Sequence, residues 1–278
     1  MKIIGNKSVS KRKFASKVKI PAIFIASILL IGALIPTTLC LFPGQLLNQV
    51  LADTVTGTDD DDNLEGSDND DDIEGKGGND KIDSKGGDDR NTGDNKEGDG
   101  DGGDDDIDSG TGDDTNVGDN AMGNGDGGDD DIDSGDGFDT NVGDNAIGNG
   151  DGGDDDIDSG DGFDLNVGDN DIGDGAGGDD VINSGTGDDT NIGDNDEGDG
   201  DGGDDVINSG KGNDINFGDN RIDSGLSAGG NDKINAAQGD DELTGGGGAD
   251  KFKCGSGDDI VTDFNEEEDK ASGNCEIT

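Results

Sequence analysis

The sequence predicts an all-β solenoid, in which short strands wind into successive coils. Apolar residues recur singly at intervals of nine, as at Leu64, Ile73 and Ile82, and each follows an aspartate by two residues. Near-identical units of 25 residues then fill the middle of the chain. A fixed period of this kind is typical of repeat proteins, whose units stack and bury one continuous, narrow core.

The composition excludes most familiar enzyme sites. The chain has 278 residues, of which 26% are hydrophobic, and it contains no His, Trp or Tyr. Without histidine there can be no Ser-His-Asp triad, no Cys-His dyad and no His-based zinc site. Carboxylates recur in every repeat, which favours a ligand or solvation role over acid–base catalysis. We therefore expect that the protein is not an enzyme.

The charge of the chain points to cations as partners. There are 71 acidic and 18 basic residues, giving a net charge of −53. Seven of the basic residues precede Asp53 and no acidic residue does, so the remainder carries 11 − 71 = −60. This charge disfavours nucleic acid and anionic lipid as partners of the acidic body. With so few apolar residues, an acidic disordered chain that buffers cations is an alternative to a folded solenoid.

Residues 1–52 have the composition of a targeting segment. A lysine-rich lead precedes a largely apolar run over residues 20–42, which is typical of a secretory signal peptide or an N-terminal membrane anchor helix. Val50 and Ala52 fit the small-residue pattern of a cleavage site before Asp53. Either interpretation predicts export, so that the protein is secreted or lies on the extracellular face of the cell membrane.

Each central unit is a doublet of two nine-residue halves followed by a seven-residue spacer. The segment DGGDDDIDSG begins at 101, 126 and 151, with close variants at 176 and 201. In the second half of each doublet the expected apolar position is Asn (Asn91, Asn116, Asn141, Asn166, Asn191 and Asn216). A buried Asn must be hydrogen-bonded, as in a ladder along the stack, or else face solvent. Each unit is an 18-residue coil with a bulging loop, or a larger coil with three short strands.

These periods divide the chain into five parts. We expect a signal peptide or anchor over 1–52, nonapeptide repeats over 53–95, the 25-residue repeats over 96–225, further nonapeptide repeats over 226–264, and an acidic cap over 265–278.

The stretches GGNDKIDSKGGDD from Gly77 and GGNDKINAAQGDDELTGGGGADKF from Gly229 resemble the nonapeptide G-G-x-G-x-D-x-U-x of the repeats-in-toxin (RTX), hemolysin-type calcium-binding family, where U is apolar. The resemblance extends over residues 57 to 264. It implies a parallel β-roll in which turns of adjacent coils bind Ca²⁺ between them. Carried over position by position, the motif aspartates are Asp62, Asp71, Asp80, Asp89, Asp105, Asp114, Asp130, Asp139, Asp155, Asp164, Asp180, Asp189, Asp205, Asp214, Asp232, Asp241, Asp250 and Asp259.

The residue types suit this chemistry. Glycine allows sharp turns with exposed carbonyls, and aspartate supplies the hard anionic oxygen that calcium prefers. We therefore expect a stand-alone, exported calcium-binding protein whose folding is coupled to Ca²⁺. The alternative is a structural or adhesive solenoid that binds mineral, ice or matrix at the cell surface. Its flat face would use Thr115, Thr140 and Thr190, although Leu165 and Ile215 interrupt that row.

Cys254 and Cys275 lie in the least repetitive segment. Export would permit a disulfide between them, which would clip the acidic tail onto the last coil. Two free thiols are the alternative.

Overall fold

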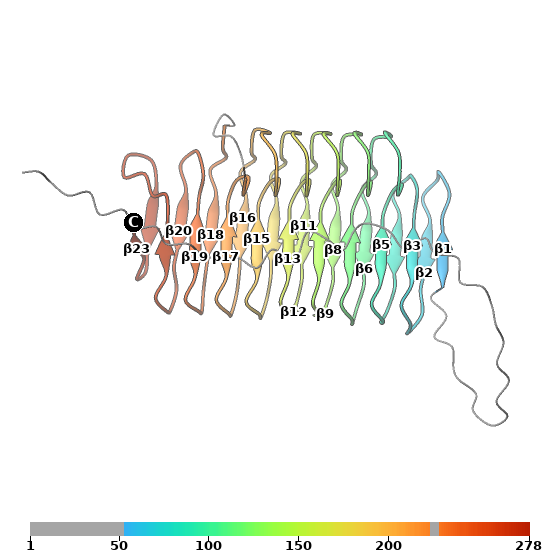
Figure 1. Ribbon diagram of the computed structural model, residues 1–278, viewed down its shortest axis with the longest axis horizontal. Coiled ribbons are helices and arrows are strands. Elements are labelled where there is room, and N and C mark those ends of the chain that lie inside the picture. The colour runs from blue at the N-terminus through green and yellow to red at the C-terminus, as the bar shows by residue number, and fades with distance from the viewer. Residues whose placement is uncertain (1–52, 223–227) are drawn as a thin grey trace, which may run out of the picture. The chain divides into compact units, whose positions relative to one another are not determined.

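The computed structural model describes residues 53–222 and 228–278, and these residues form stacked β-coils (Figure 1). The predicted all-β, parallel architecture is confirmed, and no helix occurs in the described ranges. The predicted signal or anchor helix falls within residues 1–52 and lies outside them.

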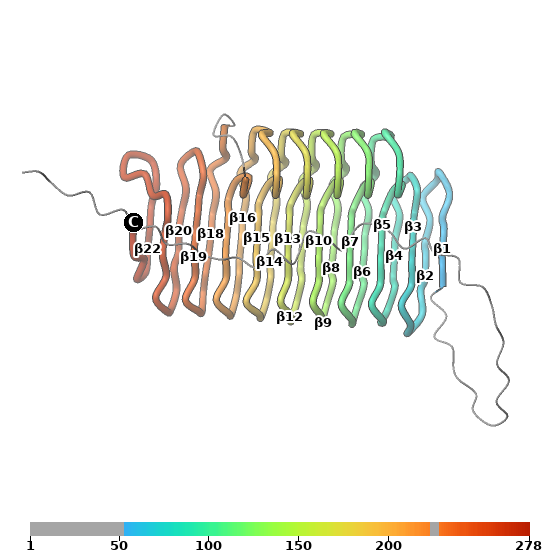
Figure 2. The backbone as a smooth tube through the Cα atoms, in the orientation of Figure 1, coloured from blue at the N-terminus to red at the C-terminus, as the bar shows by residue number. Residues whose placement is uncertain are grey.

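Each coil contributes one strand to each of two parallel sheets (Figure 2). Sheet A contains β1 Thr54–Thr56, β3 Asp72–Glu74, β5 Arg90–Thr92, β7 Thr115–Val117, β10 Thr140–Val142, β13 Leu165–Val167, β15 Thr190–Ile192, β17 Ile215–Phe217, β19 Glu242–Thr244, β21 Ile260–Val261 and β23 Glu276–Ile277. Sheet B contains β2 Asn63–Glu65, β4 Lys81–Asp83, β6 Asp106–Asp108, β8 Asp131–Asp133, β11 Asp156–Asp158, β14 Val181–Asn183, β16 Val206–Asn208, β18 Lys233–Asn235, β20 Lys251–Lys253 and β22 Lys270–Ser272. A third, two-stranded sheet pairs β9 Asp136–Gly137 with β12 Asp161–Gly162.

The sequence period sets the register between coils. Val55 pairs with Ile73, 18 residues later, whereas Ile107 pairs with Ile132, 25 residues later. Equivalent side chains therefore stack directly above one another. From sheet B the stack is apolar and fully or almost fully buried, and it consists of Leu64, Ile82, Ile107, Ile132, Ile157, Ile182, Ile207, Ile234 and Phe252.

Sheet A lines the core with asparagine in the central coils. The side-chain amide of each Asn donates to the side-chain oxygen of the next over 2.9 Å, from Asn91 through to Asn216. Each amide also donates to a buried serine hydroxyl seven residues earlier, as Asn141 does to Ser134 over 3.0 Å. The ladder interpretation is therefore correct, because these polar groups are fully buried and hydrogen-bonded.

The spacers neither bulge freely nor form a third three-residue strand. They pair with one another through single parallel bridges, as at Ile147 with Ile172. Backbone bonds such as Gly123 N–H to the Ile147 carbonyl (3.0 Å) continue the ladder across the spacers. Each central unit is thus one enlarged coil of 25 residues, and the spacers form the larger loops on one side of the stack (Figure 2).

The predicted disulfide joins Cys254 to Cys275. Cys254 is fully buried in the apolar core, and Cys275 packs against it. Between these positions β22 pairs with β20, and beyond them β23 pairs with β21. The acidic tail therefore adds a final coil to the stack.

Candidate metal centres

The motif aspartates form two rows, one at each edge of the stack. Each directly precedes a strand, and the β-turns on either side of the sheets bring equivalent residues of successive coils together. We call the turns that run from sheet A to sheet B the spacer edge, and those that run from sheet B to sheet A the short-turn edge. The spacer edge carries Asp62, Asp80, Asp105, Asp130, Asp155, Asp180, Asp205, Asp232 and Asp250. The short-turn edge carries Asp71, Asp89, Asp114, Asp139, Asp164, Asp189, Asp214, Asp241 and Asp259.

One carboxylate oxygen of every motif aspartate except Asp62 has a fixed partner in the preceding coil. The backbone N–H of Asp130 donates to Oδ1 of Asp155 over 2.7 Å, and that of Asp155 donates to Oδ1 of Asp180 over 2.7 Å. The same bond recurs on the short-turn edge, from Asp114 to Asp139 over 2.8 Å. These bonds orient each carboxylate along the stack.

The second oxygen, Oδ2, is buried and has no hydrogen-bond partner among the described residues at most motif positions. These are Asp80, Asp89, Asp105, Asp114, Asp130, Asp139, Asp155, Asp164, Asp180, Asp189, Asp205, Asp214, Asp232, Asp241 and Asp259. A buried polar atom without a partner is costly, and a native structure rarely leaves many of them. A repeated row of such atoms fits positions at which cations bind.

On the spacer edge these oxygens face backbone carbonyls. A Cβ on Gly143 would overlap both Oδ2 of Asp155 and the carbonyl oxygen of Gly168. Gly118 stands in the same relation to Asp130 and the Gly143 carbonyl. Two acceptors that lie this close cannot hydrogen-bond to each other, whereas a hard cation binds both.

Electrostatics agree with this geometry. Burial, together with nearby carboxylates, raises the pKa of Asp105 to about 8 and that of Asp232 to about 9. On the short-turn edge burial raises the pKa of Asp114 and Asp139 to about 7. Burial also raises the pKa of Asp155 well above its usual range. Buried carboxylates resist ionisation unless positive charge is supplied, so these residues fit a divalent cation.

The first coils differ from the rest. Oδ2 of Asp62 accepts hydrogen bonds from the backbone and hydroxyl of Thr58, and Oδ2 of Asp71 accepts them from Ser67. No group of three or more acidic, His or Cys side chains converges on one point within the described residues. Ligand sets at the motif positions would therefore combine one or two carboxylates with backbone carbonyls.

A third row of buried aspartates was missed by reasoning from the nonapeptide. It contains the aspartates of the repeated Gly-Asp-Asn segment that follows each central sheet A strand: Asp94, Asp119, Asp144, Asp169, Asp194 and Asp219. Their recurrence every 25 residues is visible in the sequence, but the family pattern has one aspartate per nonapeptide and gives them no role. We call them the GDN aspartates.

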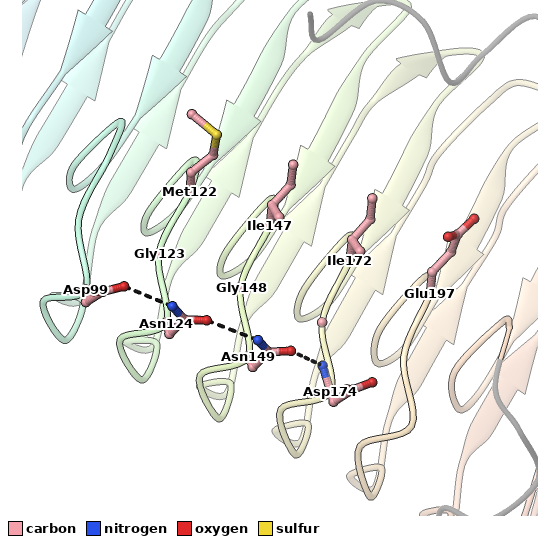
Figure 3. A pocket seen from close by; sticks show the side chains of 11 residues that line it. Asp99, Met122, Gly123, Asn124, Ile147, Gly148, Asn149, Ile172, Asp174 and Glu197 are labelled. Carbon is pink, nitrogen blue, oxygen red and sulfur yellow. Dashed lines mark hydrogen bonds between the residues drawn. The ribbon is translucent and has the colours of Figure 1, made fainter.

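The spacers also form a groove (Figure 3). The exposed side chains of Met122, Ile147 and Ile172 line one side. On the other side, Asn149 Nδ2 donates to Asn124 Oδ1 over 3.0 Å. The groove is therefore a regular, partly apolar surface, and its lining also includes the carboxylates of Asp99, Asp174 and Glu197.

Comparison with known proteins finds matches to one family model near the two ends of the stack. Residues 52–90 and 226–261 match the family model of the RTX calcium-binding nonapeptide repeat, in four copies. The enlarged central coils lie between these two matches. No curated protein and no solved structure matches this chain. Within the described residues, no helix is long and apolar enough to cross a membrane.

Proposed function

We propose that this chain, an RTX-type repeat protein, binds Ca²⁺ along both edges of its β-roll and that calcium binding drives its folding. The observation that carries the proposal is the repeated row of buried motif Oδ2 atoms without hydrogen-bond partners. At Asp130 and Asp155 these atoms face the carbonyls of Gly143 and Gly168.

The ligands would come from two sources. The motif aspartates supply Oδ2, and the turn glycines supply carbonyl oxygens on the spacer edge. Calcium accepts six to eight oxygen ligands in flexible geometry, so water completes such a site. A bound Ca²⁺ supplies the positive charge that the buried carboxylates lack.

Coupling to folding follows from the composition of the core. In the central coils sheet B buries one apolar side chain per coil, and sheet A buries one Asn followed by one Val or Ile, such as Asn141 and Val142. The body of the chain carries about −60, so that self-repulsion opposes compaction. Because the ligand set exists only in the folded coil, the free energy of binding becomes free energy of folding.

The proposal extends to the place of action. The lysine-rich lead and the apolar run over residues 20–42 support export, either as a secreted protein or by anchoring in the membrane. Extracellular calcium suits modest sites, since extracellular modules bind it with Kd values of about 10⁻⁴–10⁻³ M. We assign the carboxylates a ligand role and no catalytic one, because they recur in every coil. Fractionation of cells and the mass of the mature chain would test both export and cleavage before Asp53.

A calcium titration of the purified full chain tests the proposal. Far-UV circular dichroism should show a transition from coil to β-structure at millimolar Ca²⁺, with several ions bound by calorimetry. Magnesium serves as the control. Mg²⁺ is smaller than Ca²⁺, requires octahedral geometry and keeps its bound water, so it should not replace Ca²⁺ at these sites. A chain that stays disordered in several millimolar Ca²⁺, or that folds fully in chelator, contradicts the coupling.

The groove in Figure 3 favours a second candidate, an extracellular solenoid that binds a repetitive surface such as mineral, ice or matrix. Met122, Ile147 and Ile172 repeat in register beside the Asn124–Asn149 ladder. Replacing Ile147 and Ile172 by Lys should abolish adhesion in calcium while the dichroism spectrum is unchanged. Adhesion equal to that of the unmodified chain would exclude this face.

A further inference from the structure

The GDN aspartates lie in the interior of the spacer edge. Asp119, Asp144, Asp169 and Asp194 are fully buried, and Asp94 is 1% exposed. They belong to the enlarged coils that separate the two family matches, and the nonapeptide pattern does not include them.

Carboxylates of consecutive coils converge within this row. A Cβ on Gly127 would overlap Oδ1 of Asp144 and come within 2.7 Å of Oδ2 of Asp119. Gly152 relates in the same way to Asp144 and Asp169. Gly177 and Gly202 show the same arrangement, so four consecutive junctions hold oxygens of two carboxylates against a glycine.

Several oxygens of the row have no hydrogen-bond partner within the described residues. They are Oδ1 of Asp94 and Asp119, and Oδ2 of Asp169 and Asp194. Oδ2 of Asp169 points to the junction beside Gly177, where Oδ1 of Asp194 also lies. The latter oxygen accepts one bond of 2.9 Å, from the backbone N–H of Gly203. Fully buried oxygens of like charge thus face each other with few donors.

The surrounding charge is negative as well. After burial, the groups that raise the pKa of Asp144 are the carboxylates of Asp155, Asp169 and Asp119. A central coil thus buries two carboxylates on the spacer edge, such as Asp144 and Asp155, and together they carry −2 when ionised.

We propose that the GDN aspartates form a third row of divalent-cation sites, one between each pair of consecutive central coils, in addition to the motif turns. This inference rests on the proposed calcium binding. Two carboxylates from successive coils hold each ion, so the ions join the enlarged coils to one another. Six aspartates in the row make 6 − 1 = 5 junctions.

The test counts bound ions on the full chain. A triple variant carries Asp119→Asn, Asp144→Asn and Asp169→Asn, which keep side-chain shape and remove three charges. The matched control carries Asp131→Asn, Asp133→Asn and Asp156→Asn, which remove three exposed charges on sheet B. Equilibrium dialysis at saturating Ca²⁺ in physiological salt, followed by elemental analysis, gives the number of ions per chain.

The triple variant should lose about four ions relative to the unmodified chain, because it breaks four of the five junctions, and the control should lose none. Equal binding by the triple variant overturns the inference and shows that protons occupy the row. An equal loss in the control also overturns it, since the loss then reflects net charge. An unmodified chain that binds no calcium instead refutes the proposed function.

Circular dichroism in calcium checks that the variants fold. If the triple variant does not fold, the single variant Asp144→Asn decides the matter. It removes the two junctions that Asp144 shares and should bind about two ions fewer, whereas an unchanged count refutes the third row.

Discussion

The side-chain amide of Asn116 donates a 2.9 Å hydrogen bond to the side-chain oxygen of Asn141, the equivalent residue one coil later. Both side chains are fully buried. This bond repeats along sheet A opposite the isoleucine stack of sheet B. The central core therefore contains a continuous amide ladder beside its apolar side chains, and a slip of one residue between coils would break every rung. The ladder fixes the stacking register where apolar contacts alone are few.

We expect Asn141→Ala to destabilise the calcium-loaded protein by about 2 kcal/mol or more. The change leaves one N–H of the Asn116 amide and the side-chain oxygen of Asn166 unpaired in the core, and each such buried group costs about 1–3 kcal/mol. The midpoint of urea unfolding at fixed calcium measures the effect.

Asn149→Ala is the matched control, since it removes a rung from the exposed spacer ladder of the same coil. Its midpoint should stay within about 0.5 kcal/mol of the unmodified chain. Equal midpoints for the two variants would show that the buried ladder adds no stability.

Gly143→Ala should disrupt a spacer-edge site. Its Cβ would overlap the Gly168 carbonyl and Oδ2 of Asp155, so that the backbone must move, at a cost of about 1–3 kcal/mol. We expect both a lower unfolding midpoint and weaker calcium binding by calorimetry. Gly100→Ala is the control, because nothing lies within 4 Å of a Cβ at that position. Calcium affinity unchanged by Gly143→Ala would argue against ligation between these turns.

The sequence predicts the coil because its period is explicit. The nine-residue spacing of Leu64, Ile73 and Ile82 specifies one inward side chain per strand, and all three are buried as expected. The motif aspartates fall into rows for the same reason: stacking in register brings equivalent positions together. The sequence predicts the position of each motif aspartate, but it does not predict which of the two carboxylate oxygens lacks a hydrogen-bond partner.

What could not be predicted depends on contacts between coils. The choice between a buried Asn ladder and Asn side chains that face solvent depends on contacts such as that of Asn141 with the hydroxyl of Ser134, which the turn between two strands sets. The path of the spacer depends on bridges between neighbouring spacers, such as Ile147 with Ile172. The burial of Asp119 and Asp144 follows from that path, which explains why the GDN aspartates were missed.

Replacing Asp130, Asp155 and Asp180 by Asn should make folding less dependent on calcium. An amide nitrogen in place of Oδ2 can donate to the facing glycine carbonyl, and it removes a buried charge whose desolvation costs several kcal/mol. We expect the dichroism transition at a lower Ca²⁺ concentration and with fewer ions bound. The control variant replaces the exposed Asp131, Asp133 and Asp156 by Asn and loses the same charge. A shift of equal size in both variants would attribute the effect to overall self-repulsion instead.

Breaking the disulfide should loosen the last coil and leave the rest of the stack folded. Cys254 and Cys275 are 21 residues apart, and closing a loop of that size stabilises a fold by about 3 kcal/mol in the chain-entropy description. In repeat proteins each coil contacts only its neighbours, so the effect should stay local. With Cys254→Ser and Cys275→Ser in calcium, we expect rapid proteolysis after β21, with strands β2 to β18 still protected. The intact chain with and without reductant provides the comparison. Equal cleavage rates for the bonded and unbonded tail would mean that the pairing of β22 and β23 with β20 and β21 secures the end by itself.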